Sequence, residues 1–255
     1  MIQCLCTKGI RTGHSLRRAA LLALVLLYSA GIQAFQVHPM SYTLEPAGDG
    51  SRQTLRLENT FRHAVAIEME VSRRSMDEYG RVTHVPAEED FLVFPPQTRL
   101  EPGATQAVRV QYIGDPALSE TRAYTIAARQ VPVRSPDSEA ASVQVVFNMG
   151  TAAYVRPAGA RAELDPVQLI VTDDEDGVTA IVHNRGNGHM NLHNALWSLR
   201  NGDGREQALD RDTLQELFNN PIIYPGHSRH VRLPADLVGD ATEITLEVRP
   251  ASRGQ

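Results

Sequence analysis

Apolar and polar residues alternate in short segments from Phe35 onward, with the period of two that is typical of strands with one buried face. Residues that favour turns separate these segments, and very little of the chain repeats at helical spacing. The segments fall into two sets, at residues 35–157 and at residues 158–255. The first set has about the seven strands of an immunoglobulin-like sandwich, and the second is smaller. The pattern therefore predicts an all-β protein with two domains.

The same alternation places the individual strands. Pro39 interrupts the first one and indicates an edge strand or a strand that changes sheets. Pro157 fixes its own φ and marks a short, stiff joint between the two sets. The strands predicted for the first set are Val37–Leu44, Gln53–Glu58, Val65–Val71, Phe91–Val93, Ala107–Tyr112, Tyr124–Val131 and Ser142–Pro157. Those predicted for the second set are Val167–Thr172, Val178–Asn184, Met190–Leu199, Val231–Leu233 and Ile244–Val248, with one helical turn at Asp212–Phe218.

The segment Ser142–Pro157 is longer than the other predicted strands, and no charged residue occurs between Val143 and Val155. Edge strands normally carry charges that prevent pairing with other chains. The large apolar residues of this segment occupy every second position and so share one face of an extended chain: Val143, Val145, Phe147 and Met149. Two interpretations stay open at this point. The segment is either an ordinary strand that is covered on both faces, or an apolar edge that pairs with another chain.

Residues 1–34 are predicted to be a secretory signal that is cleaved after Ala34. A basic stretch without acidic residues precedes a short apolar run, Ala19–Leu27. That run is shorter than the roughly 20 apolar residues of a membrane-spanning helix, so an uncleaved anchor is the weaker alternative. Both cysteines, Cys4 and Cys6, lie in this leader, and the exported protein is therefore expected to lack disulfides.

The charge balance excludes some partners. The net charge is −5, and removing the basic leader makes the remaining chain more acidic, which argues against nucleic-acid binding. Lys8 is the only lysine, so any anion site in the mature protein must use arginine or a protonated histidine. Arg73 and Arg74 are adjacent and are expected to form a solvent-facing pair.

No pattern in the sequence indicates catalysis or a cofactor, and two patterns that could bind a metal are each incomplete. There is no Gly-x-Ser-x-Gly, no glycine-rich phosphate loop and no cysteine after the leader, so we expect a protein that is not an enzyme. His183, His189 and His193 suggest a metal site, but the spacing of the last two converges only on a helix, and glycines here favour turns. The run Asp173–Asp176 lacks the further ligands of a calcium loop and is interpreted as a hairpin tip.

Three segments in their order and spacing carry a family resemblance. They are Leu100–Gly103 followed by Val108–Val110, the strand Glu120–Ile126 with its continuation to Pro132, and Tyr154–Pro157. With these segments the chain resembles the periplasmic pilus-assembly chaperones of the chaperone–usher pathway. The resemblance implies two immunoglobulin-like domains, at residues 35–157 and 158–255, arranged as an L with a pilin subunit bound in the cleft between them.

The resemblance also implies a mechanism for the uncharged strand. A pilin subunit is an incomplete sandwich, and a chaperone of this family lends it a strand by β-augmentation before an outer-membrane usher receives the subunit. The residues that would bind the client are then Val143, Val145, Phe147 and Met149. The implied location is the periplasm, without a cofactor and without a membrane-embedded segment, and the exposed strand would also allow self-association.

The sequence departs from the best-known members where the client's terminal carboxylate is held. The positions that correspond to the usual Arg and Lys are Ser41 and Ala152, and neither side chain is a cation. Arg129 and Arg156 are the candidate anchors instead, because a guanidinium can bind a carboxylate with two hydrogen bonds. This departure points to a divergent branch of the family, such as the archaic type.

The rival hypothesis is a secreted structural protein, either a two-domain adhesin or a pilus subunit. A subunit is expected to carry a free donor extension at its N-terminus. The residues after Ala34 instead enter the first strand almost at once, which favours the chaperone.

Overall fold

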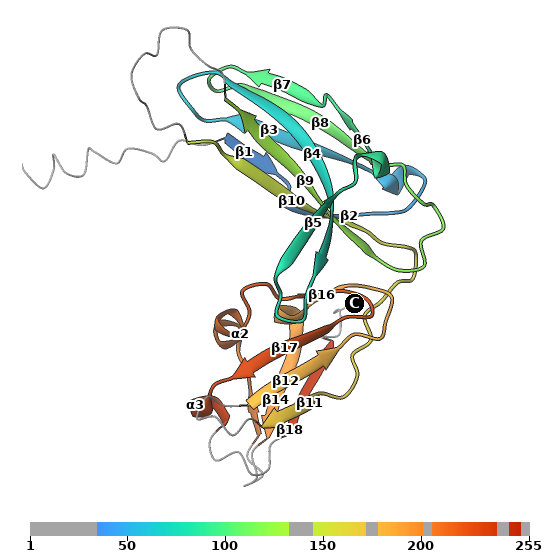
Figure 1. Ribbon diagram of the computed structural model, residues 1–255, viewed down its shortest axis with the longest axis vertical. Coiled ribbons are helices and arrows are strands. Elements are labelled where there is room, and N and C mark those ends of the chain that lie inside the picture. The colour runs from blue at the N-terminus through green and yellow to red at the C-terminus, as the bar shows by residue number, and fades with distance from the viewer. Residues whose placement is uncertain (1–34, 133–144, 172–177, 201–205, 239–244, 251–255) are drawn as a thin grey trace, which may run out of the picture. The chain divides into compact units, whose positions relative to one another are not determined.

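The computed structural model describes residues 35–132, 145–171, 178–200, 206–238 and 245–250, and most of these residues lie in strands (Figure 1). The first sandwich contains β1 (Phe35–His38), β2 (Ser41–Leu44), β3 (Arg52–Asn59), β4 (Val65–Met76), β5 (Val82–Pro86), β6 (Phe91–Phe94), β7 (Gln97–Leu100), β8 (Thr105–Tyr112), β9 (Arg122–Val131) and β10 (Asn148–Val155). The second contains β11 (Gln168–Val171), β12 (Val178–His183), β13 (Met190–Asn191), β14 (Ala195–Arg200), β15 (Glu206–Ala208), β16 (Ile222–Ile223), β17 (Ser228–Leu233) and β18 (Thr245–Pro250). Short helices are α2 (Arg211–Leu217) and α3 (Ala235–Val238), with 3-10 turns at Asp49–Ser51, Glu88–Asp90 and Leu192–Asn194.

Two sheets form the first sandwich. One has the strand order β1-β3-β8-β6, and the other has the order β2-β10-β9-β4-β5, with β7 also paired to β4. Their inward residues alternate along the strands and form one apolar core, in which Leu55, Leu57, Val108 and Ile126 are fully buried. The prediction of an all-β fold with an immunoglobulin-like sandwich is confirmed.

The chain changes sheets at Pro39, as one of the two alternatives for this proline predicts. β1 pairs antiparallel with β3 in the first sheet, whereas β2 pairs parallel with β10 in the second sheet. The predicted strand Val37–Leu44 is thus two strands. The short β2 is thus the neighbour of β10, which lies within the uncharged segment Val143–Val155.

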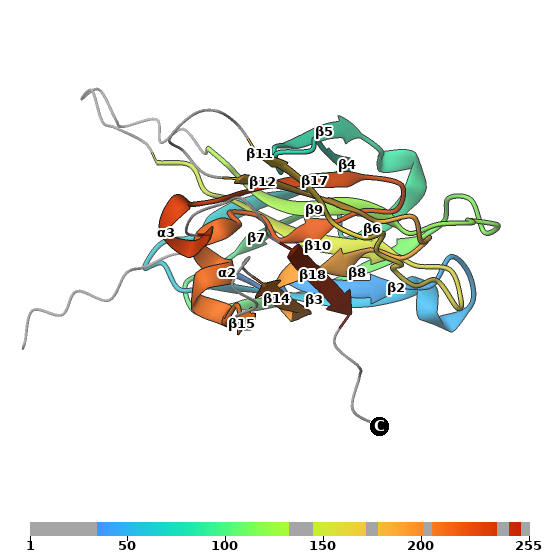
Figure 2. The same cartoon turned by 90° about the horizontal axis from the view of Figure 1, so that it is seen from below.

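The second sandwich packs around Trp197, which is 2% exposed, as expected from the sequence. Figure 2 shows β11, β12 and β17 side by side, and β14 lies between β15 and β18 in another sheet. The helical turn predicted at Asp212–Phe218 is α2, whose first turn is capped by the side chain of Asp210.

Some elements differ from the prediction for identifiable reasons. The predicted strand Met190–Leu199 is interrupted by a 3-10 turn, because the side chain of Asn191 accepts a hydrogen bond from the backbone N–H of His193. β4 continues past Val71 to Met76 and pairs there with β5, which the sequence did not reveal because β5 is largely exposed. Thr172 and Ile244, the ends of two predicted strands, lie outside the described residues, as do Asp173–Asp176. No helix in the described ranges is long and apolar enough to cross a membrane.

Candidate functional site

The uncharged strand is shorter than predicted. The sequence predicts a strand over Ser142–Pro157, but β10 spans Asn148–Val155. Its partner β9 ends at Val131. Just before β10 begins, the N–H of Gln130 on β9 donates to the carbonyl of Phe147 at 2.9 Å. Val145 precedes the strand, and Val143 lies outside the described residues.

β10 has a neighbouring strand on both sides along only half of its length. β9 pairs with all of it, whereas β2 pairs only with Ala152–Val155. The half Asn148–Thr151 therefore has no second neighbouring strand among the residues described. Because backbone groups alternate in direction along a strand and Phe147 faces β9, the N–H and C=O groups of Asn148 and Gly150 point away from β9. We call this unpaired side of Asn148–Thr151 the free edge.

The apolar side chains of this strand leave the core gradually. Val155 and Ala153 are fully buried, Met149 and Phe147 are half-buried at the margin of the core, and Val145 is 62% exposed. The ring of Phe147 packs at 5.5 Å from the ring of Phe61. The apolar side chains that fill the core at one end of β10 thus continue past the core at the other end, where the free edge lies.

The two positions that correspond to the family's usual anchor lie directly opposite each other. Ser41 on β2 and Ala152 on β10 are partners in the parallel ladder. They mark the point at which β2 begins to cover β10. Neither side chain can bind an anion by charge.

The structure does not bring the two candidate anchors together. Arg129 lies opposite Asn148 near the start of β10, whereas Arg156 follows its end. Arg129 pairs with Glu68 at 2.7 Å and with Glu70 at 2.5 Å, so two carboxylates neutralise its charge. Arg156 donates from Nε to the carbonyl of Ala160 at 2.8 Å and keeps its charge without a described carboxylate partner.

Arg74 is a third candidate that the sequence interpretation missed. It is half-buried rather than solvent-facing, and its Nη2 donates to the hydroxyl of Tyr154 at 2.9 Å. Its Nε is buried without a hydrogen-bond partner, and no carboxylate of the described chain forms an ion pair with it. Tyr224 packs in the same cluster and is 5% exposed, and its hydroxyl lies close enough to Arg74 to interact with the guanidinium. These groups bring a half-buried positive charge next to two tyrosine rings. We call Arg74, Tyr154 and Tyr224 the Arg74 cluster.

His189 lies beside the Arg74 cluster. Its ring stacks on Tyr154 with 3.9 Å between the centroids, and its Nδ1 is buried without a partner. Burial first, and then the guanidinium groups of Arg156 and Arg74, lower the pKa of His189 from 6.5 to about 4. An anion bound at the Arg74 cluster would offset this repulsion.

The depressed pKa of His189 predicts a pH dependence of folding. The unfolded chain takes up this proton below about pH 6.5, whereas the folded chain takes it up only near pH 4. The unfolding free energy therefore does not depend on His189 above pH 6.5 and falls as the pH is lowered from 6.5 to 4. The loss is roughly 3 kcal/mol. Urea unfolding at pH 7 and pH 4 should show a smaller loss of unfolding free energy for His189→Phe than for the wild type. Equal losses in the two proteins would contradict this assignment.

The other histidines do not converge. His183 Nδ1 lies 2.9 Å from the hydroxyl of Ser228, and His193 Nε2 lies 3.1 Å from the carbonyl of Leu214. Within the described residues, no group of three or more His, Cys, Asp and Glu side chains is placed to hold a metal ion.

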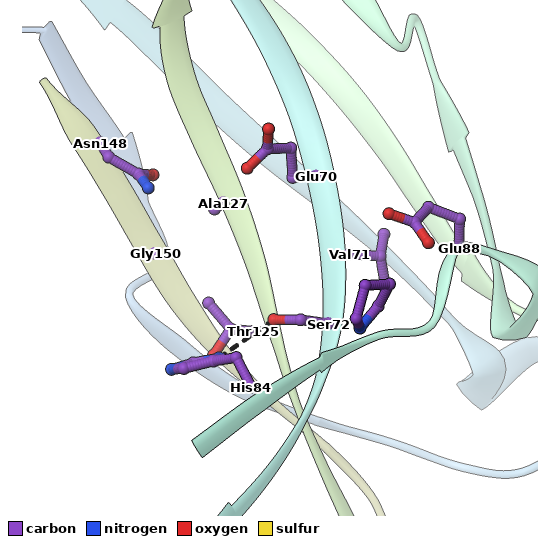
Figure 3. Close-up of a pocket in the computed structure, with 10 residues that line it drawn as sticks. Glu70, Val71, Ser72, His84, Glu88, Thr125, Ala127, Asn148 and Gly150 are labelled. Atoms are coloured by element: carbon purple, nitrogen blue, oxygen red, sulfur yellow. Dashed lines mark hydrogen bonds between the residues drawn. The ribbon is translucent and has the colours of Figure 1, made fainter. Parts of the chain in front are cut away.

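A hollow of about 600 Å³ lies on the outer face of the sheet that contains β10 (Figure 3). The hollow is deep over Gly150 and Ala127, because these two residues have almost no side chain. Glu70 and Glu88 stand at its sides, and His84 bonds to Ser72 at 3.0 Å. The hollow begins at the strand that carries the free edge.

The chain is similar to known proteins in sequence and in fold. The family of pili and flagellar-assembly chaperones, described by its PapD N-terminal domain, matches residues 37–161. A search of curated protein sequences finds no match. The solved class 5 fimbriae chaperone CfaA superimposes with a TM-score of 0.56 at 15% identity, covering 87% of this chain and 95% of CfaA.

Two further solved structures share the fold. The E. coli chaperone DraB has a TM-score of 0.52 at 20% identity, with 83% of this chain and 88% of that chain covered. A chain from the Salmonella enterica complex of the SafA pilin with the SafB chaperone has a TM-score of 0.52 at 16% identity, with 86% and 98% covered. The likeness spans both sandwiches.

Proposed function

We propose that this chain, whose residues 37–161 match the family of pili and flagellar-assembly chaperones, completes pilin subunits by lending them β10. The chain is a chaperone of pilus assembly. The chaperones of this family are not enzymes. The observation that carries the proposed mechanism is the free edge of β10, with an apolar row that continues past the core of its own sandwich.

The donated surface has two parts. The free edge offers the backbone groups of Asn148 and Gly150 to a strand of the client, which gives affinity that is independent of the client's sequence. Val145, Phe147 and Met149, together with Val143, then fill pockets of the client's unfinished sandwich. Burying side chains of this size supplies roughly 1.5–3 kcal/mol each before the costs of ordering.

The Arg74 cluster is the proposed anchor for the client's terminal carboxylate. Arg74 is half-buried beside Tyr154 and Tyr224, and its guanidinium can bind a carboxylate with two hydrogen bonds. Arg156 follows the end of β10 and contributes a further positive charge. Arg129 stays a weaker candidate, because Glu68 and Glu70 already neutralise it.

In the cell, the chain would be exported before it meets its client. Residues 1–34 would direct export to the periplasm and be cleaved after Ala34, leaving domains at residues 35–157 and 158–255. An outer-membrane usher would receive the subunit when another strand replaces β10. In the absence of a client, the free edge would allow two copies of the chain to associate.

Co-expression with a pilin subunit in two forms tests this function. The natural subunit, whose sandwich lacks a strand, should form a soluble one-to-one complex with the chain. The same subunit fused to its own missing strand should not, because the groove is already filled. A complex of equal stability with both forms would contradict strand donation.

A further inference from the structure

We propose that the hollow beside the free edge selects clients by accepting a cationic side chain, an arginine or a lysine, from the client strand that pairs with β10. The proposal rests on the strand donation proposed above and adds a preference for client strands that carry a cation at one position. It concerns the outer face of the sheet, not the apolar row or the Arg74 cluster.

A row without side chains connects the free edge to an acid. Gly150 on β10 is the ladder partner of Ala127 on β9, and Ala127 is the partner of Glu70 on β4. A Cβ at position 150 would lie 2.8 Å from Cγ2 of Thr125, so the packing itself favours glycine there. The small side chains at positions 150 and 127 leave the hollow open on the client's side, and Glu70 lines it beyond them.

The distance suits a long side chain. A strand paired at the free edge lies three strand spacings from β4, roughly 14 Å. Every second side chain of such a strand points to the outer face of the sheet. The extended side chains of an arginine and of Glu70 reach toward each other over Gly150 and Ala127, whereas a short polar side chain would stop at the rim.

The charge of the hollow is negative. Glu70 and Glu88 line it, and Glu68 stands next to them on β4. Arg129 pairs with Glu68 and Glu70. Glu88 lines the hollow and forms no ion pair with a described residue, which leaves room for a second cation.

Neutral groups of the hollow can accept hydrogen bonds from that cation. The hydroxyl of Thr125 is buried without a partner at the floor, and the side chain of Asn148 projects over the same face (Figure 3). Both oxygens can accept from a guanidinium or an ammonium group. A carboxylate at the same position would instead be repelled by Glu70 and Glu88.

Two matched peptides test the proposal. Each has nine residues that alternate valine and threonine, with either arginine or glutamate at the central outward position. With the full chain at low salt, we expect the dissociation constant of the arginine peptide, measured by fluorescence anisotropy, to be at least tenfold lower. The preference should shrink below threefold in Glu70→Gln/Glu88→Gln, and it should persist in the control Glu89→Gln, which changes an exposed neighbour of Glu88 that does not line the hollow.

The outcomes separate this proposal from the proposed function. If both peptides bind equally, or if the double variant keeps the full preference, the cation site is wrong while strand pairing stands. If neither peptide binds, pairing at the free edge fails, and the cation site fails with it. Thermal unfolding of each variant shows whether its sandwich is intact.

Discussion

Replacing Val145 by aspartate is expected to abolish capture of a pilin subunit while leaving the chain folded. Val145 is 62% exposed in the free protein, so its loss removes little of the chaperone's own core. In a complex it would fill an apolar pocket of the client, where an unpaired carboxylate costs several kcal/mol and the lost valine about 1.5 kcal/mol more. We expect the affinity to fall at least 100-fold. Titration of purified subunit into each variant measures this change.

The matched control is Leu196→Asp, because Leu196 in the second sandwich has the same exposed fraction of 62%. It should leave capture unchanged. Phe147→Asp is a poorer probe, since Phe147 packs on Phe61 and its loss also weakens the first sandwich. If Val145→Asp binds the subunit as tightly as the wild type does, the donated row is not this one.

Arg74→Gln is expected to weaken the same complex by about 30-fold or more. Leaving a buried charge of the partner without its counterpart costs roughly 2–5 kcal/mol, and the carboxylate of the client would lose both the charge and a donor. Because Arg74 also donates to Tyr154, the variant should lose some stability as well, which urea unfolding measures separately. The affinity is compared at a pH and temperature at which both proteins are folded.

Arg73→Gln provides the control, since Arg73 is the exposed neighbour of Arg74 on the same strand. A client whose C-terminus is extended by a few residues should lose affinity for the wild type but not for Arg74→Gln. If Arg129→Gln or Arg156→Gln weakens binding more than Arg74→Gln does, the anchor lies with that residue and not with the Arg74 cluster.

The alternation of apolar residues was sufficient to predict the fold. It placed β3, β8 and β9 within a few residues of their observed bounds, and Pro39 indicated the change of sheet. Trp197 was expected in the core of the second domain and lies there. These features depend on local chemistry, which a sequence displays directly.

The features that local chemistry does not determine were missed or left open. The free edge exists because β2 meets β10 only from Ala152 onward, and that register depends on tertiary pairing. The burial of Arg74 depends on Tyr154, 80 positions away, whereas an Arg-Arg pair in isolation indicates a solvated surface. β5 has few buried residues, so its pairing with β4 left no apolar period to detect.

Amide hydrogen exchange in the complex with a pilin subunit tests strand donation at the level of single residues. If the client strand pairs with the free edge, exchange at Asn148 and Gly150 should slow by 100-fold or more when the subunit is bound. The amide of Ala152, which already donates to the carbonyl of Met40 at 2.8 Å, should be unaffected and serves as the internal reference. A tight complex in which Asn148 and Gly150 exchange as they do in the free protein would contradict the account.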